Sequence, residues 1–117
     1  MYSEIHTENL KLFDTDKNKT KLNVLKHADS RDFVMIDGKS TYVMPENIEV
    51  IGENAFNGSS VQCVVFSPNL KKICDDAFSA SAIEEAVIPD SVVDIGKGAF
   101  IYCKNLTKVL ISPDICN

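Results

Sequence analysis

The fold is decided by the segment Ile88-Pro89-Asp90-Ser91-Val92-Val93-Asp94-Ile95-Gly96-Lys97-Gly98-Ala99-Phe100-Ile101-Tyr102-Cys103-Lys104-Asn105-Leu106-Thr107-Lys108-Val109-Leu110-Ile111, whose pattern occurs three times in the chain. The dipeptide Ala-Phe recurs at a step of 22 residues, at Ala55-Phe56, Ala77-Phe78 and Ala99-Phe100. Aliphatic residues in phase with it are Ile48, Leu70 and Val92; Ile51, Ile73 and Ile95; and Val61, Ile83 and Leu106. A unit this short cannot enclose a core by itself, so each unit must be covered by its neighbours. The sequence therefore predicts a solenoid.

Each unit contains one clear strand pattern. In residues 106–112 apolar and polar positions alternate, which predicts a strand with Val109 and Ile111 inward and Lys108 and Leu110 outward. Equivalent strands of successive units are expected to stack in parallel, about 4.8 Å apart.

The rest of the unit predicts a second side of the solenoid. Residues 91–95 form a short extended pattern, and residues 96–102 have the length of one or two helical turns. We expect the phenylalanine of each copy to point into the core.

The third copy resembles the BspA-type leucine-rich repeat, whose pattern is I-P-x-x-V-x-x-I-G-x-x-A-F-x-x-C-x-x-L-x-x-V-x-I. This resemblance implies an α/β leucine-rich repeat right-handed solenoid, with short stacked parallel strands and short helical turns. It covers residues 42–117, as about three repeats with a truncated fourth. In the second copy Cys74 takes the place of the glycine found at Gly52 and Gly96. If that position has a positive φ, Cys74 is strained where its glycine counterparts are not.

Residues 1–41 lack the repeat signature and are predicted to form an N-terminal β-rich cap. Residues 31–36 and 39–43 are typical of two strands around an Asp37-Gly38 hairpin turn. Residues 21–26 are a further candidate strand. The first dozen residues fit a short helix or a strand equally well.

Composition excludes several classes of function. The 117 residues carry 17 acidic and 12 basic side chains, a formal charge of −5, with 44% hydrophobic residues. This acidic balance disfavours nucleic acid and anionic membrane surfaces, and no apolar run is long enough for membrane insertion. No secretory signal pattern begins at Met1.

Motifs for catalysis or metal binding are weak. Residues 14–18 begin like an EF-hand calcium loop, but Lys19 stands where glycine is needed and Leu25 where glutamate should close the loop. His6 and His27 have no metal-ligand spacing, and we expect no enzyme, no cofactor and no metal site. The four cysteines occupy different repeat columns, which argues against a disulfide ladder; they are Cys63, Cys74, Cys103 and Cys116.

The sharpest functional hypothesis concerns the outward positions of the stacked strands. The repeat alignment places Val65, Val87 and Leu110 in one row, which would form an exposed apolar stripe. We interpret it as a protein-contact surface flanked by Glu84, Glu85 and Lys108. The alternatives are that the N-terminal segment covers this row, or that the alternation of inward and outward residues is blurred there.

Two functions are compatible with this pattern. The resemblance implies an adhesin-like protein-binding module that contacts a host or matrix protein from the cell surface. The alternative is an intracellular scaffold or structural repeat protein. We expect a surface or extracellular location if a signal lies outside this chain and a cytoplasmic one otherwise. Self-association through the open C-terminal end is a further possibility.

Overall fold

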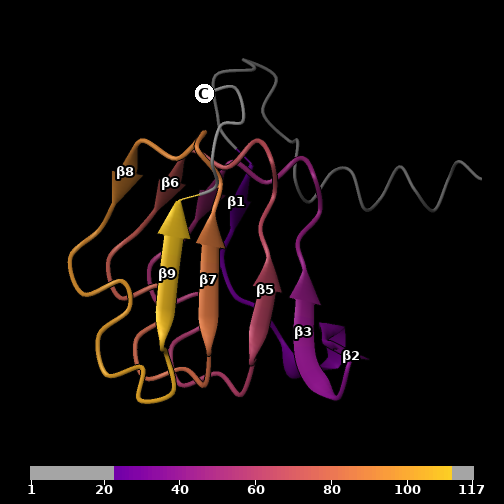
Figure 1. Ribbon diagram of the computed structural model, residues 1–117. Helices are drawn as coiled ribbons and strands as arrows, with labels where there is room; N and C mark the ends of the chain where they lie inside the picture. Colours follow the sequence, from indigo (N-terminus) through magenta and orange to yellow (C-terminus); the bar gives the residue numbers. More distant parts are fainter. Residues whose placement is uncertain (1–22, 112–117) are drawn as a thin grey trace, which may run out of the picture.

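The computed structural model describes residues 23–111, which wind into four stacked coils (Figure 1). Each coil contributes one strand to each of two sheets, so the molecule is a parallel β-solenoid. The predicted solenoid is confirmed. Expectations for residues 1–22 and 112–117, among them the calcium-like loop, His6 and Cys116, lie outside the described residues.

The first sheet has four short strands in the order β1-β4-β6-β8. They are β1 (Val24–Leu25), β4 (Val50–Ile51), β6 (Lys72–Ile73) and β8 (Asp94–Ile95). All three pairings are parallel, and β4 and β6 align Ile51 with Ile73. The candidate strand in residues 21–26 is thus present as β1, and the extended pattern of residues 91–95 as β8.

The second sheet has five strands in the order β2-β3-β5-β7-β9. They are β2 (Val34–Ile36), β3 (Lys39–Val43), β5 (Cys63–Val65), β7 (Glu85–Ile88) and β9 (Lys108–Ile111). β2 and β3 form the predicted antiparallel hairpin, whereas β3, β5, β7 and β9 run parallel (Figure 1). Asp37 and Gly38 both have a positive φ, as a two-residue hairpin turn requires.

The core lies between the two sheets and is built from the repeat columns. Ile51, Ile73, Phe78 and Ile83 are fully buried. The rings of Phe56 and Phe78 stack with centroids 4.5 Å apart, and those of Phe78 and Phe100 with centroids 5.2 Å apart. The prediction that these phenylalanines point inward is confirmed, and they form a continuous stack along the solenoid.

The predicted helical turns are wrong. The only helical segment in residues 23–111 is a 3₁₀ turn at Ser30–Asp32, so the fold is all-β in place of the expected α/β class. The segments around the Ala-Phe dipeptides are runs of turns. Their amides alternate between bonds within the coil and bonds to the next coil: the amide of Ala77 donates to the carbonyl of Cys74, whereas that of Phe56 donates to the carbonyl of Ala77 at 2.6 Å and that of Phe78 to the carbonyl of Ala99 at 2.7 Å.

Left-handed residues explain why these segments do not become helices. A positive φ occurs just before each Ala-Phe dipeptide and again two residues after it, and such residues cannot continue a right-handed helix. The positions are Asn54, Asp76 and Gly98, and then Gly58, Ala80 and Tyr102.

The condition stated for backbone strain at Cys74 is not met. Neither Gly52 nor Gly96 has a positive φ, and neither does Cys74. Gly96 is required for a different reason: a Cβ there would lie 2.5 Å from the amide nitrogen of Asp75 in the preceding coil. At Gly96, close approach of successive coils therefore excludes a side chain, whereas the same column accommodates Cys74 one coil earlier.

The last described coil has the predicted register but is not buried. Val109 and Ile111 align with the inward residues Ala86 and Ile88 of β7, yet they are 49% and 60% exposed. Within residues 23–111 no coil follows β9 to cover them. The expectation that they are inward therefore holds for the register and not for burial.

Candidate functional site

A row of exposed apolar side chains crosses the outer face of the five-stranded sheet, and we call it the valine–leucine row. The strand register places Val43 beside Val65, and Val87 beside Leu110. The four side chains are 50%, 52%, 45% and 46% exposed. The three predicted members thus lie on one face, as the repeat alignment required.

Alternation along each strand directs these side chains outward. The residues just before Val43, Val65 and Val87 face the core and are buried; they are Tyr42, Val64 and Ala86. Successive side chains of a strand point to opposite faces, so the next residue must face solvent. The alternation is clear in the described residues, so the interpretation of blurred alternation is wrong. The interpretation that the N-terminal segment covers the row concerns residues 1–22 as well, which lie outside the described residues.

Val43 was not predicted as a member of this row. Tyr42-Val43 shows the same inward–outward pattern as Val64-Val65, which is the signal that identifies it. The predicted cap, residues 1–41, ends inside the strand pattern of residues 39–43, and the predicted row includes only the strands of the three later copies. In the structure β3 pairs in parallel with β5, so it belongs to the same sheet as the later copies.

A hollow of about 380 Å³ opens beside the middle of the row. Its walls include the outward Val65 and Val87 and the prolines that follow their strands, Pro68 and Pro89. The apolar surface is therefore wider than one row of side chains, and it is indented between the second and third coils.

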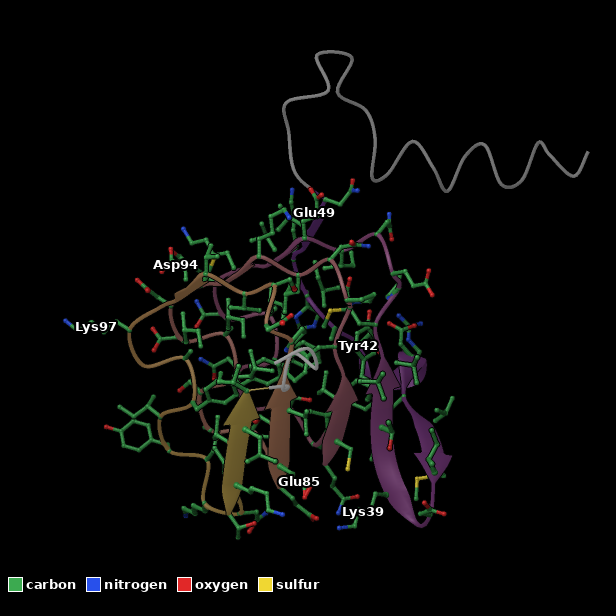
Figure 2. The ribbon with its side chains drawn as sticks, turned by 45° about the horizontal axis from the view of Figure 1, so that its top comes forward. Lys39, Tyr42, Glu49, Glu85, Asp94 and Lys97 are labelled. Atoms are coloured by element: carbon green, nitrogen blue, oxygen red, sulfur yellow. The ribbon has the colours of Figure 1, made fainter. Side chains whose placement is uncertain are left out.

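Polar side chains flank the row at the amino ends of the strands, where Figure 2 shows Lys39 and Glu85. The ammonium of Lys39 pairs with one carboxylate oxygen of Glu84. The side-chain amide of Gln62 donates to the other oxygen at 3.0 Å, and its own oxygen accepts from the amide of Ser40 at 2.9 Å. This chain of contacts joins the first three coils along the edge of the sheet.

These contacts shift the titration of both charged groups. Hydrogen bonds from Lys39 and then Gln62 hold the pKa of the Glu84 carboxyl below its ordinary value, and the hydrogen bond to Glu84 raises the pKa of Lys39. Glu85 and Lys108 form a longer pair at 3.9 Å on adjacent strands. The predicted flanking residues therefore lie together, as two ion pairs beside the row.

An NMR titration of the Glu84 carboxyl tests this arrangement. We expect a pKa below 4.5, and we expect Lys39→Ala to raise it toward that value, because the main hydrogen bond is lost. The stability contributed by this lowered pKa is present above the ordinary value and declines as the pH falls through the lowered one. Lys104→Ala serves as a control at an exposed site. An unchanged Glu84 pKa in Lys39→Ala would contradict the pairing.

A second hollow, of about 600 Å³, lies at the amino-terminal end of the solenoid. It is lined by apolar strand residues together with Lys26, His27, Asp32 and Tyr42. Burial raises the pKa of Tyr42, whose ring packs edge-on against Phe56 with centroids 5.4 Å apart. His27 is exposed here.

The described cysteines form no disulfide bond. Cys63, Cys74 and Cys103 are free and partly buried. The thiol of Cys103 donates to the carbonyl of Phe78 at 3.0 Å, and its sulfur lies 3.6 Å from the Ser81 hydroxyl. Cys103 thus serves as a packed, hydrogen-bonded side chain between coils.

Across residues 23–111, no three side chains of the histidine, cysteine and carboxylate types gather as a metal centre. Nor does that part of the chain contain a helix of the length and hydropathy needed to cross a bilayer.

The sequence model of the BspA type Leucine rich repeat region (6 copies) matches residues 33–117. The crystal structure of the Pneumococcal vaccine antigen PcpA is 35% identical, with a TM-score of 0.59. A leucine rich cell surface protein from Faecalibacterium prausnitzii A2-165 is 26% identical, with a TM-score of 0.57. No curated protein matches the chain significantly.

These similarities concern part of much longer proteins. The two structural alignments cover 62% and 59% of this chain and 18% of each of the other chains. The chain therefore spans under a fifth of the length of either solved structure. It is similar to bacterial leucine-rich repeat proteins, one of which is described as a cell surface protein.

Proposed function

Since the chain belongs to the BspA-type leucine-rich repeat family, we propose that it is a protein-binding module whose contact surface is the outer face of the five-stranded sheet. The valine–leucine row carries this proposal. Four large aliphatic side chains in adjacent strands are about half exposed, and contiguous apolar surface of this kind commonly marks an interface.

The surroundings of the row have the layout of an interface. An apolar centre with one indentation is bordered by ion pairs and polar side chains, which resembles the apolar core and polar rim of protein contacts. Association there would bury the row and leave the Lys39–Glu84 and Glu85–Lys108 pairs at the rim. The predicted role of Val65, Val87, Leu110, Glu84, Glu85 and Lys108 as contact residues is part of this proposal.

We place the module at a cell surface, in an adhesin-like contact with a host or matrix protein. The similarity to a pneumococcal vaccine antigen and to a bacterial cell surface protein supports this location. The alternative, an intracellular scaffold, is favoured by the free cysteines Cys63, Cys74 and Cys103. Antibody labelling of intact cells of the source organism discriminates between them, because only a surface protein is labelled without permeabilisation.

The binding surface is tested with immobilised fibronectin, laminin and collagen as probes. We expect the protein to bind at least one, and Val65→Asp/Leu110→Asp to weaken that binding about tenfold or more, because two charges would enter the apolar centre. Val93→Asp is the matched control, since Val93 is 84% exposed beside β8 on the other sheet.

Circular dichroism establishes that each variant is folded, and Val65→Thr/Leu110→Thr replaces the aspartate variant if it is not. Unchanged binding in the folded double variant would overturn the proposed surface. Absence of wild-type binding to all three probes would overturn the matrix-adhesin form of the proposal.

A further inference from the structure

We propose that the partner segment that binds the valine–leucine row is an amphipathic α-helix that lies across the strands. The side of this helix that faces Pro68 and Pro89 carries basic side chains. The inference rests on the proposed function and names the partner chemistry that fits the surface. Its grounds are the spacing of the row, the hollow beside it and the distribution of unpaired acidic groups.

The spacing of the row matches the stripe of a helix. Four residues in adjacent strands lie at about 0, 4.8, 9.6 and 14.4 Å along the solenoid. Helical positions i, i+3, i+7 and i+10 lie at about 0, 4.5, 10.5 and 15 Å along the helix axis. Each pair of positions agrees to within about 1 Å. One face of a helix can therefore contact Val43, Val65, Val87 and Leu110 in turn.

An extended partner segment fits the row poorly. Side chains on one face of a strand are about 6.6 Å apart, whereas the side chains of the valine–leucine row are about 4.8 Å apart. A partner strand that lies along the row would therefore match it at one position and miss the next. A partner strand would instead pair with an edge of the sheet, where it would not cover the row. The apolar row, which runs across the strands, thus selects a helix over a strand.

The hollow supplies an anchor point for such a helix. It opens between Val65 and Val87 and is closed on one side by Pro68 and Pro89, with a volume of about 380 Å³. This is enough for one leucine or phenylalanine side chain from the middle of the helix. Bulky apolar side chains held in central pockets contribute most of the binding free energy in many interfaces.

The acidic groups around the row give the helix an orientation. At the amino ends of the strands the acids are paired, as Glu84 with Lys39 and Glu85 with Lys108. Beyond the carboxyl ends, Glu46 and Asp90 are exposed, each just after a proline, and have no ion pair within residues 23–111. Lysine or arginine on the side of the helix that faces the prolines would complement these acidic groups. The chain's formal charge of −5 also favours a basic partner.

Three synthetic peptides of about 18 residues, or five helical turns, test the proposal. Two have the same composition of leucine, lysine and alanine: one carries leucine at i, i+3, i+7 and i+10, the other at every second position. The third is the helical pattern with glutamate in place of lysine. Fluorescence anisotropy at 50 mM NaCl measures each affinity for the full chain. We expect the helical lysine peptide to bind about tenfold or more tightly than either of the others.

Two double variants locate the binding. Val65→Thr/Val87→Thr keeps the shape and strand preference of these side chains, and we expect it to weaken binding about tenfold. Glu46→Lys/Asp90→Lys should weaken it by about fivefold at low salt, and less at 500 mM NaCl because salt screens the charges. The controls are Val93→Thr and Glu53→Lys/Asp94→Lys, away from the row, with changes under about twofold.

Equal binding of the alternating peptide, or unchanged affinity in the threonine variant, would overturn the helix inference. The proposed function fails separately. If a matrix protein binds through the row while the helical peptide neither binds nor competes, the inference fails and the proposed function stands. If the row variants leave matrix-protein binding unchanged, the proposed function fails whatever the peptide does.

Discussion

Phe78→Ala is expected to lower the free energy of unfolding by about 3–5 kcal/mol, the range for removing a fully buried phenylalanine. Phe78 has no exposed surface and occupies the centre of the aromatic stack. Its ring is nearly parallel to those of Phe56 and Phe100, with interplanar angles of 8° and 9°. It also meets Phe66 edge-on at a centroid distance of 5.9 Å.

The effect is large because the cavity cannot collapse. The coils above and below Phe78 are held by backbone hydrogen bonds at the same dipeptide, from the amide of Phe56 to the carbonyl of Ala77 and from the amide of Phe78 to the carbonyl of Ala99. These bonds fix the separation of the coils, so the space left by the ring stays open. The loss then includes the cavity as well as the transfer of the ring from water.

Phe100→Ala is the matched control. Phe100 has the same role in the last described coil but is only partly buried. We expect it to cost about 2 kcal/mol or less, because less apolar surface returns to water. Urea unfolding followed by circular dichroism measures both values. Equal losses for the two variants would contradict the view that stacking from both sides sets the stability.

The sequence predicted the solenoid because its columns are spaced regularly. Ile51, Ile73 and Ile95 keep a constant step, and the structure aligns the three in one sheet. A solenoid requires only that equivalent residues stack, so periodicity alone determines register. The same periodicity predicts that Val65, Val87 and Leu110 lie in one row.

The length of residues 96–102 suggests helical turns, but the backbone conformation of single residues decides the structure of this segment. Asn54, Asp76 and Gly98 are of the types that most readily adopt a positive φ, a signal that was available in the sequence. Ala80 and Tyr102 are not residue types that favour a positive φ, so the sequence carries no such signal at these positions. At Ala80 a bond to the next coil accompanies this conformation: its amide donates to the carbonyl of Ile101 at 2.9 Å.

The candidate site was only partly predictable. The row follows from the repeat step, but the Lys39–Glu84 pair joins residues 45 positions apart, one of them in the segment predicted as a cap. Only the parallel pairing of β3 with β5 brings Lys39 to the same edge as Gln62 and Glu84. A strand without the repeat signature, such as β3, can pair with the edge strand of the solenoid. The periodicity of the sequence does not predict such a pairing.

Gly96→Ala is expected to lower the free energy of unfolding by about 2–3 kcal/mol, although alanine ordinarily stabilises a chain relative to glycine. An added Cβ would lie 2.5 Å from the amide nitrogen of Asp75 and 2.6 Å from the carbonyl carbon of Cys74. These are backbone atoms, so no side-chain rotation relieves the clash.

The contacts around Gly96 show what would be lost if the coils separated. The amide of Gly96 donates to the carbonyl of Ile73 at 2.7 Å, the amide of Lys97 donates to the Asp75 carboxylate at 2.9 Å, and the amide of Asp76 donates to the carbonyl of Lys97 at 3.1 Å. A shift large enough to admit the methyl group would stretch all three. The last coil would therefore loosen, while the first three coils kept their contacts.

Gly52→Ala is the control, because Gly52 occupies the same column one coil earlier than Cys74, and its nearest contact is the Leu25 carbonyl oxygen at 3.2 Å. A neighbour that yields by a few tenths of an ångström accommodates that methyl group, so we expect a loss under about 1 kcal/mol. Urea unfolding gives both values, and amide hydrogen exchange shows whether the Gly96→Ala loss is concentrated in residues 94–111. If Gly96→Ala were as stable as the wild type, close approach of the coils would not be the reason for glycine in this column. A uniform increase in exchange would mean that the coils unfold as one unit, and that the fourth coil supports the three before it.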